Sequence, residues 1–270
     1  MREKPARGLF RAEWRRAYRS WIWFAVPLLI FGIMALEILS DFPDAQTRRQ
    51  YIMSNVGYYC FGINFGSIVI ALPFLAGFVH APTAADDWNS GLAVYILRRT
   101  SAWRYALAKY AACTLSAAAA ICLGFVLYAI YTSILYLPSD IARYPRQVLP
   151  LEDSTLYGNL YGHHGGIAFF LVHFFQMALY GAVWSGVGAV CAVLFRQRFA
   201  APLSSMIVYH VAMYATQVLG WRWLDPAAMI VYFDNNVDFT IWNIVLVQGA
   251  ALLLLGILFV GLTARRARNG

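Results

Sequence analysis

Long apolar runs separated by shorter polar segments make up most of this chain. A helix needs about 20 mostly apolar residues to cross a hydrocarbon core of roughly 30 Å. Six runs reach that length: residues 21–39, 56–79, 105–137, 167–195, 199–221 and 241–262. Because the runs are continuous and do not alternate with polar residues, they indicate helices and not the strands of a barrel. The pattern therefore predicts an all-α integral membrane protein with six transmembrane helices.

The composition agrees with this prediction and limits the domain organisation. Hydrophobic residues account for 61% of the 270 positions and charged residues for 13%, against about 45–50% and about 25% in soluble domains. We therefore expect a single transmembrane domain over residues 1–270. Its parts are an interfacial arm at 1–20, a six-helix bundle at 21–262 and a cytoplasmic tail at 263–270.

The distribution of lysine and arginine predicts the orientation of the bundle. Sixteen of the 21 lysines and arginines lie in the two ends of the chain, in the segment after the second run and in the turn after the fourth. Cytoplasmic loops are enriched in these residues. We therefore expect both termini on the cytoplasmic side of a cell (plasma or inner) membrane, which the chain crosses several times. The net charge of +8 follows from this topology, and no nucleic-acid partner is expected.

The N-terminal arm "RGLFRAEWRRAYRSW", residues 7–21, alternates apolar and basic positions at helical spacing. Its apolar positions are Leu9, Phe10, Trp14, Ala17, Tyr18 and Trp21. This pattern is typical of an amphipathic helix that lies in the membrane interface and leads into the first span. Such a helix can be a positively flanked anchor or a surface for a cytoplasmic partner, and the two interpretations are compatible.

The segment "APTAADDWNSGLAVYILRRTSAWRY", residues 81–105, predicts a separate short helix between the second and third spans. Thr83 and Asp86 have the spacing of a capping box, with Pro82 at the entry. The start is acidic, the middle apolar and the end basic, through Asp86, Asp87, Leu92, Tyr95, Ile96, Arg98 and Arg99. Charges in this order suit the helix dipole. The helix could simply fill the loop, or it could transmit force from a soluble partner to the bundle.

Six of the uncharged polar residues within the expected spans have amide or imidazole side chains that could act in transport. They are Asn64, His173, Gln176, His210, Gln217 and Gln248. Polar groups in a membrane face the bundle interior or a cavity, which makes these residues candidates for lining a transport pathway. The alternative is interhelical hydrogen bonding, which contributes about 1 kcal/mol for each bond.

Known catalytic and cofactor motifs are absent from the sequence. No HExxH, no GxSxG and no acidic pair within a span occurs, so we expect no catalytic, cofactor-binding or metal site. His163 and His164 form an isolated pair between glycines, which favours solvent exposure over metal binding. Because the chain has no GxxxxGK[ST] loop, any ATP and Mg²⁺ that it uses would have to bind another chain.

The run "ALPFLAGFVHAPTAADDWNSGLAVYILRRTSAWRYALAKY", residues 71–110, resembles the permease subunits of ATP-binding-cassette exporters of the type-2 class. In that family a span is followed by an acidic position, a glycine, an apolar patch and a basic residue, and a Ser/Thr turn and a lysine open the third span. The matching positions are Asp86 or Asp87, Gly91, 92–97, Arg98/Arg99, Thr100/Ser101 and Lys109. The family usually has glutamate where this chain has aspartate. The basic arm and a partly apolar outer element at 222–240, before the last span, fit the same plan.

The resemblance implies a permease without catalysis of its own. Two such subunits, identical or different, would pair in the bilayer, and separate ATPase subunits would hydrolyse the ATP. Residues 83–99 would be the coupling helix, docked on an ATPase through Asp86, Asp87, Gly91, Leu92, Tyr95, Ile96, Arg98 and Arg99. The exported cargo would be a peptide, an antibiotic or a lipid-like molecule.

Two other functions are compatible with the residues alone. The first is a self-contained secondary transporter or channel that uses the intramembrane His, Gln and Asn groups. The second, less well supported, is an intramembrane enzyme that uses His173 or His210.

Overall fold

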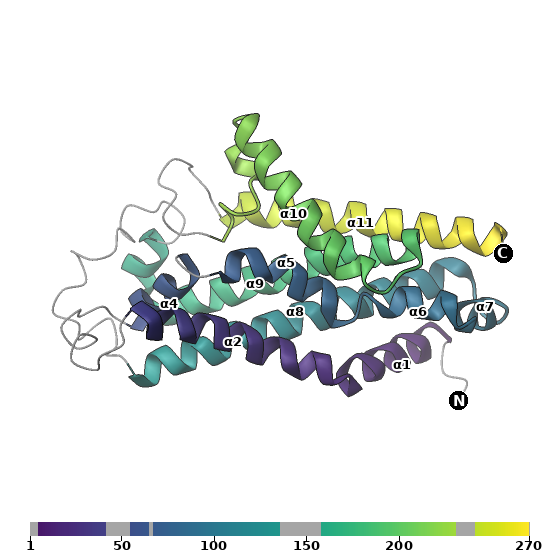
Figure 1. The fold of residues 1–270 in the computed structure, drawn as a ribbon, viewed down its shortest axis with the longest axis horizontal. Coiled ribbons are helices and arrows are strands. Elements are labelled where there is room, and N and C mark those ends of the chain that lie inside the picture. The colour runs from purple at the N-terminus through teal and green to yellow at the C-terminus, as the bar shows by residue number, and fades with distance from the viewer. Residues whose placement is uncertain (1–4, 42–54, 65–66, 136–157, 231–240, 270) are drawn as a thin grey trace.

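The described part of the computed structural model consists of helices joined by turns, with no strands. It covers residues 5–41, 55–64, 67–135, 158–230 and 241–269. The helices are α1 Pro5–Arg19, α2 Trp21–Asp41, α4 Asn55–Asn64, α5 Ile68–Val79, α6 Thr83–Asn89, α7 Leu92–Leu97, α8 Ala102–Leu135, α9 Gly158–Phe195, α10 Ala200–Val218 and α11 Ile241–Asn269, with a 3₁₀ turn η1 at Arg222–Leu224 (Figure 1). Most of the helices run along one common axis, which confirms the all-α prediction.

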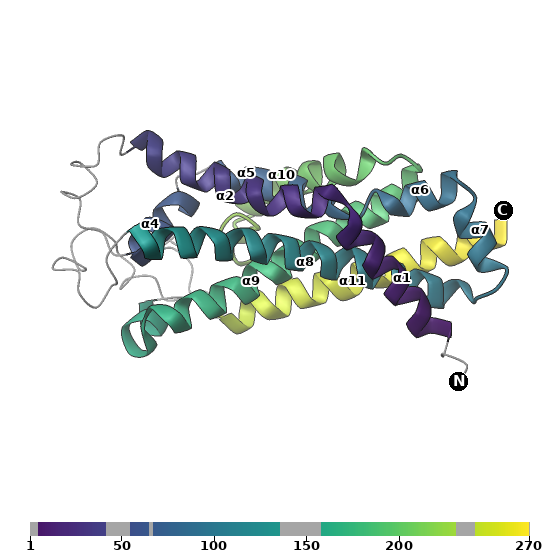
Figure 2. The same ribbon diagram turned by 90° about the horizontal axis from the view of Figure 1, so that it is seen from below.

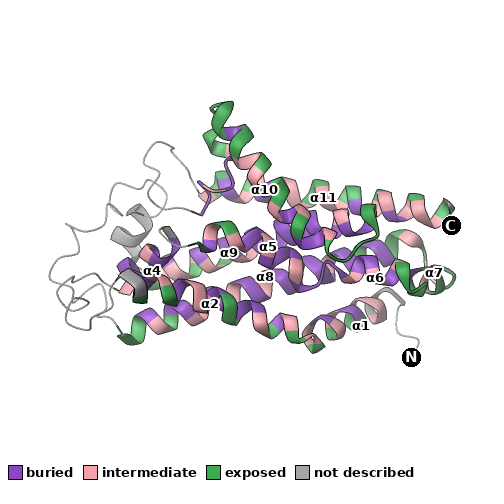
Figure 3. Ribbon diagram, viewed as in Figure 1, coloured by how far each residue is buried: buried purple, intermediate pink, exposed green. Residues whose placement is uncertain are grey.

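Helices α8 and α9 form the centre of the bundle. They pack against each other; α2, α1 and α11 pack on α8, and α10, α11 and α5 pack on α9. The span in α9 has 67% of its residues buried inside the protein, whereas the span in α11 has 17%. The buried residues are accordingly concentrated on α5, α8 and α9, whereas the outer faces of α2, α10 and α11 are exposed (Figure 3). Exposed leucine and isoleucine side chains on an outer helix suit contact with lipid.

Among the described residues, five helices are long and apolar enough to cross a membrane. The spans are Trp21–Leu39, Ile68–Asn89, Ala102–Leu135, Gly166–Phe195 and Ile241–Arg268. They support a multi-pass membrane protein. The run expected to form the fifth of six spans does form a helix, α10, but its serines, His210, Thr216 and Gln217 lower its hydropathy, and it is not among the five. A sixth span therefore stays a prediction.

The second apolar run, 56–79, does not form one continuous helix. Helix α4 ends at Asn64 and α5 begins at Ile68, and the sequence between them includes glycine, a poor helix former. After α5, a turn at His80–Pro82 leads into α6, so the span that begins at Ile68 continues to Asn89.

Both ends of the chain lie at the same end of the bundle. The N-terminal helix α1, the C-terminal end of α11 and the helices α6 and α7 gather there (Figures 1 and 2). Helix α4 lies at the opposite end. This arrangement is compatible with both termini on one side of a membrane. At the C-terminus, residues expected in a tail continue α11 as helix to Asn269.

Small residues let three helices cross closely near this shared end. A Cβ atom on Gly77 of α5 would lie 2.6 Å from Oγ of Ser205, and one on Gly188 of α9 would lie 3.0 Å from the carbonyl oxygen of Ala201. Ser205 and Ala201 belong to α10. Close packing through glycine, alanine and serine is the usual basis of helix association in membranes.

Candidate functional site

The segment expected as one capped helix over 83–99 is two short helices, α6 and α7. Gly91 separates them and has a φ of 75°, in the left-handed region that glycine adopts without steric cost. The capping box does not form. Pro82 is the N-cap residue, and the Thr83 hydroxyl donates to the carbonyl oxygen of His80 at 2.7 Å. The sequence pattern suggested continuity because the apolar spacing resumes directly after the glycine.

Helices α6 and α7 present different environments. Ala84 and Ala85 of α6 are buried against the alanines of α9. On α7, by contrast, only Ala93 is buried. The exposed residues of this second helix and its flanks are Gly91, Leu92, Val94, Tyr95, Arg98 and Arg99, and Ile96 is half-buried.

Arg99 continues this surface. Its guanidinium carbon lies 4.4 Å from the centroid of the Tyr95 ring, a cation–π geometry. The exposed side of α7 therefore combines apolar and aromatic side chains with two arginines. Such a surface suits a protein partner better than water alone, because aromatic residues and arginine are enriched in protein interfaces.

Four charged side chains from three helices meet between α1, α6 and α8, and we call them the charged cluster: Glu13, Arg16, Asp87 and Lys109. Lys109 Nζ lies 2.7 Å from Oε2 of Glu13 and 2.6 Å from Oδ2 of Asp87. Arg16 Nη1 lies 2.5 Å from Oδ1 of Asp87. The cluster thus joins the N-terminal helix and the α6 helix to the same lysine.

Two further side chains contact the carboxylates of the charged cluster. The Tyr105 hydroxyl donates to Oδ2 of Asp87 at 2.9 Å. His80 Nε2 lies 3.4 Å from Oε2 of Glu13. Buried ion pairs are stable only when their remaining lone pairs and protons are also satisfied, and the Tyr105 hydroxyl supplies one such hydrogen bond.

Burial makes the charged cluster sensitive to the loss of any member. Asp87 and Lys109 have no exposed area, and Glu13 is 5% exposed. Burial opposes the charge of Glu13, but the hydrogen bond with His80 and the charge of Lys109 outweigh it and hold the pKa of Glu13 at about 2. For Arg16, burial is likewise outweighed by Asp87, and the pKa of the guanidinium is raised. Glu13 and Arg16 are therefore charged at neutral pH.

Asp87 was expected on a docking surface, but it faces the interior and bonds within the protein. Asp86, the adjacent aspartate, is half-buried. The sequence reasoning missed the pairing of Glu13 with Lys109. Two signals were present: Glu13 shares the helical face of Phe10 and Ala17, and Lys109 is a lone charge inside an apolar run, which in a membrane calls for a partner.

Three of the candidate pathway residues contact one short segment instead of a common channel. Gln176 of α9 donates to the carbonyl oxygen of Met229, and Gln248 of α11 lies 3.7 Å from the Met229 sulfur. Gln217 of α10 donates to Oδ2 of Asp225 at 3.3 Å. These glutamines tether residues 225–229 to three different helices.

The tethered segment is packed into the bundle. Ala228, Met229 and Ile230 are buried, and Asp225 accepts a hydrogen bond from the Ala227 backbone at 2.9 Å, which closes a tight turn. Where the structure describes the partly apolar element 222–240, residues 228–230 form a turn that is buried inside the bundle. The remainder, 231–240, lies outside the described residues.

The two histidines and Asn64 are placed apart from this group. His173 is buried among aromatic rings, and its Nδ1 lies 2.6 Å from the Tyr59 hydroxyl. His210 Nδ1 lies 2.8 Å from the carbonyl oxygen of Met206 in its own helix. Asn64 ends α4, and His163 and His164 lie within α9; the side chains of these three residues are outside the described part. Within the described ranges, no three His, Cys, Asp or Glu side chains are grouped so that they could hold a metal ion.

Comparison with known proteins adds no family. No protein-family model matches the chain, and no curated protein matches it in sequence. The relationship to type-2 ATP-binding-cassette exporters therefore stays a prediction that rests on the resemblance of residues 71–110.

Proposed function

We propose that this protein is the permease subunit of a type-2 ATP-binding-cassette exporter. The observation that carries the proposal is the joint geometry of the charged cluster and α7. Helix α7, which has an exposed apolar and basic surface, follows directly on α6. Ion pairs attach α6 to α1 and α8.

Docking of the ATPase would use the exposed side of α7. Leu92, Tyr95 and Ile96 supply apolar area, and Arg98 and Arg99 supply charge for acidic groups on the partner. Gly91 lets this helix turn away from α6. Of the docking residues that the resemblance implies, Asp87 is not part of this surface, because it is buried within the protein.

Transmission of movement would use the charged cluster. Asp87 is bound simultaneously to Arg16 of α1 and to Lys109 and Tyr105 of α8. A displacement of α6 that kept these buried contacts would carry α1 and the start of α8 with it. Separating the charges instead would leave them unpaired in the interior, at a cost of about 3–5 kcal/mol.

The remaining parts of the proposal follow from the family. Two permease subunits pair in the cell membrane with both termini in the cytoplasm, and ATP and Mg²⁺ bind only to the partner ATPases. The cargo is a peptide, an antibiotic or a lipid-like molecule.

Affinity purification from the native membrane tests the proposal. A phosphate-loop ATPase should co-purify with the natural protein and be identified by mass spectrometry. Leu92→Asp and Tyr95→Asp should each abolish its recovery, because a carboxylate in an apolar contact is costly. Phe199→Asp is the matched control, since Phe199 is an apolar residue, 65% exposed, that lies outside α7 at the turn before α10.

The proposal is wrong if the chain purifies without an ATPase and transports its cargo without one. In that case the secondary transporter or channel becomes the better interpretation. It requires that His173→Ala or His210→Ala abolish flux driven by an ion gradient.

A further inference from the structure

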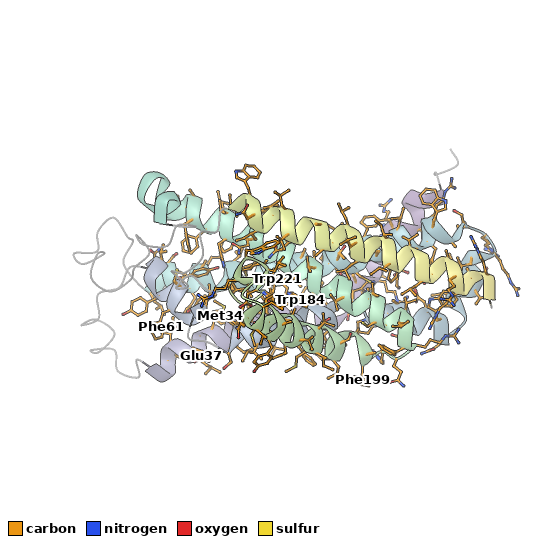
Figure 4. All side chains as sticks on the ribbon, turned by 90° about the horizontal axis from the view of Figure 1, so that it is seen from above. Met34, Glu37, Phe61, Trp184, Phe199 and Trp221 are labelled. Carbon is orange, nitrogen blue, oxygen red and sulfur yellow. The ribbon has the colours of Figure 1, made fainter. Side chains whose placement is uncertain are left out.

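A cavity of about 340 Å³ lies between α9, α10 and α11. The segment with Leu224, Pro226 and Met229 covers one side of it, and Tyr180 and Trp184 of α9 and Ala251 of α11 form other walls. Figure 4 shows Trp184 between α10 and α11, about midway along the bundle. The volume falls in the range of ligand pockets, roughly 300–1,000 Å³.

Three polar atoms of the cavity wall lack a hydrogen-bond partner among the described residues: the Tyr180 hydroxyl, Trp184 Nε1 and Gln248 Oε1. Gln248 lines the cavity and is 3% exposed. Its Nε2 contacts the Met229 sulfur at 3.7 Å, and its Oε1 has no hydrogen-bond partner among the described residues. A buried carbonyl oxygen without a donor is costly. The site therefore offers an acceptor to a ligand that brings a hydroxyl or an N–H group.

The rest of the lining is suited to a hydrocarbon chain. It consists mainly of valine, leucine and alanine side chains from the three helices, and an empty space there would forfeit their dispersion contacts. Tyr180 and Trp184 add a hydroxyl and an indole N–H to the same lining. A hydroxyl head group, which both donates and accepts, matches this combination better than a charged one.

The cavity is accessible from the side of the bundle. Val208 of α10 and Leu254 of α11 both line it, and they are 40% and 62% exposed. Their exposed faces belong to helices that present apolar residues outward, where a membrane protein meets lipid. A molecule could therefore enter from the bilayer without crossing the bundle.

We propose that this cavity binds a single-chain membrane amphiphile whose head group donates a hydrogen bond to Gln248. The apolar chain lies against α10 and α11. The head group lies next to residues 225–229, the segment that the glutamines tether. This inference does not depend on the proposed transport function, because it concerns the isolated chain and requires no ATPase.

Photo-crosslinking of the purified full-length protein in lipid nanodiscs tests the inference. The probe is hexadecanol that carries a diazirine in its chain, and the matched probe is its methyl ether, which cannot donate. Labelling by the alcohol should saturate, be competed by unlabelled hexadecanol and map to peptides of α10 and α11. The ether should require about tenfold more probe, the loss expected for one hydrogen bond.

Three variants make the experiment specific. Ala251→Trp, which fills the cavity, should abolish saturable labelling, and Leu253→Trp should retain it because Leu253 is 71% exposed on the lipid side of α11. Gln248→Leu should make the two probes equivalent. If Ala251→Trp is not monodisperse in size-exclusion chromatography, Ala212→Leu narrows the same cavity from α10.

Two outcomes would overturn the inference. The first is labelling that rises linearly with probe and is unaffected by either filling variant, which is partition into bulk lipid. The second is equal saturable labelling of the natural protein by the alcohol and the ether, which would show that Gln248 does not select the head group.

Discussion

The Nζ atom of Lys109 lies 2.7 Å from Oε2 of Glu13, a residue 96 positions earlier in the chain. This contact attaches the amphipathic N-terminal helix to the central helix α8 by a buried ion pair. Such a helix would otherwise be held only by its apolar face and the interface. The same lysine binds Asp87, so the attachment includes α6.

Replacing the shared cation should destabilise the protein strongly. Lys109→Met leaves two buried carboxylates with less compensation, and removal of one partner from a buried ion pair costs about 3–5 kcal/mol. Thermal unfolding of the purified protein in detergent measures the effect. Arg104→Met is the matched control, because Arg104 is an exposed cation on the same helix and should change stability by less than about 0.5 kcal/mol. Equal effects would show that the charged cluster contributes no special stability.

Protonation of Glu13 should weaken the attachment of α1 to α8 over a defined range of pH. The pKa of Glu13 is held at about 2 in the fold, against an ordinary value of 4.5. A carboxyl with a lowered pKa contributes stability that is complete above the ordinary value and is lost as the pH falls through the lowered one. Melting temperatures measured from pH 6 to pH 2 should therefore fall mainly below about pH 4.5. The Glu13→Gln variant should have a lower melting temperature than the natural protein at pH 6. Its melting temperature should then fall less between pH 6 and pH 2, because it has no carboxyl to protonate at this position.

Enlarging a glycine at the crossing of α5, α9 and α10 should disturb packing there. Gly77→Val places side-chain atoms against Ser205, Ala201 and Pro202, where even a Cβ would be too close. Overpacking of this kind costs about 1–3 kcal/mol. Unfolding of the variant, compared with Gly249→Ala, measures it, since a Cβ on Gly249 meets nothing within 4 Å. If Gly249→Ala is equally destabilising, the crossing is not a close one.

Releasing the tethered segment should increase its exchange with solvent. Gln176→Leu removes the bond to the Met229 carbonyl oxygen, a loss of about 1 kcal/mol, and hydrogen–deuterium exchange of residues 225–230 should accelerate several-fold. His210→Leu is the control, because His210 bonds to its own helix. An acceleration in the control but not in Gln176→Leu would contradict the tethering.

The apolar pattern predicted the helices better than their boundaries and contacts. The first, third and fourth runs correspond to α2, α8 and α9, because an apolar run of that length has few alternatives to a buried or lipid-facing helix. The division of the run 56–79 was not predicted, since apolar residues lie on both sides of the break. The division at Gly91 was missed for a similar reason: helical spacing does not report a positive φ.

The contacts of the polar residues could not be read from the sequence. Gln176, Gln217 and Gln248 looked like pathway residues because they lie in spans, yet a segment that returns into the bundle binds them. The sequence identified Lys109 as a member of a motif and Glu13 only as one acidic residue in a basic arm. Which acid meets which base depends on how α1 crosses α8, and this is a property of tertiary packing.

The charged cluster also changes how the basic residues near the termini contribute to membrane insertion. Its two cations and two carboxylates balance one another, so the cluster adds no net charge to this end of the bundle. The attraction for anionic lipid head groups is left mainly to exposed arginines, among them Arg11, Arg15, Arg19, Arg98 and Arg99. Insertion of the nascent chain can thus use the charge of Lys109, which the finished protein buries.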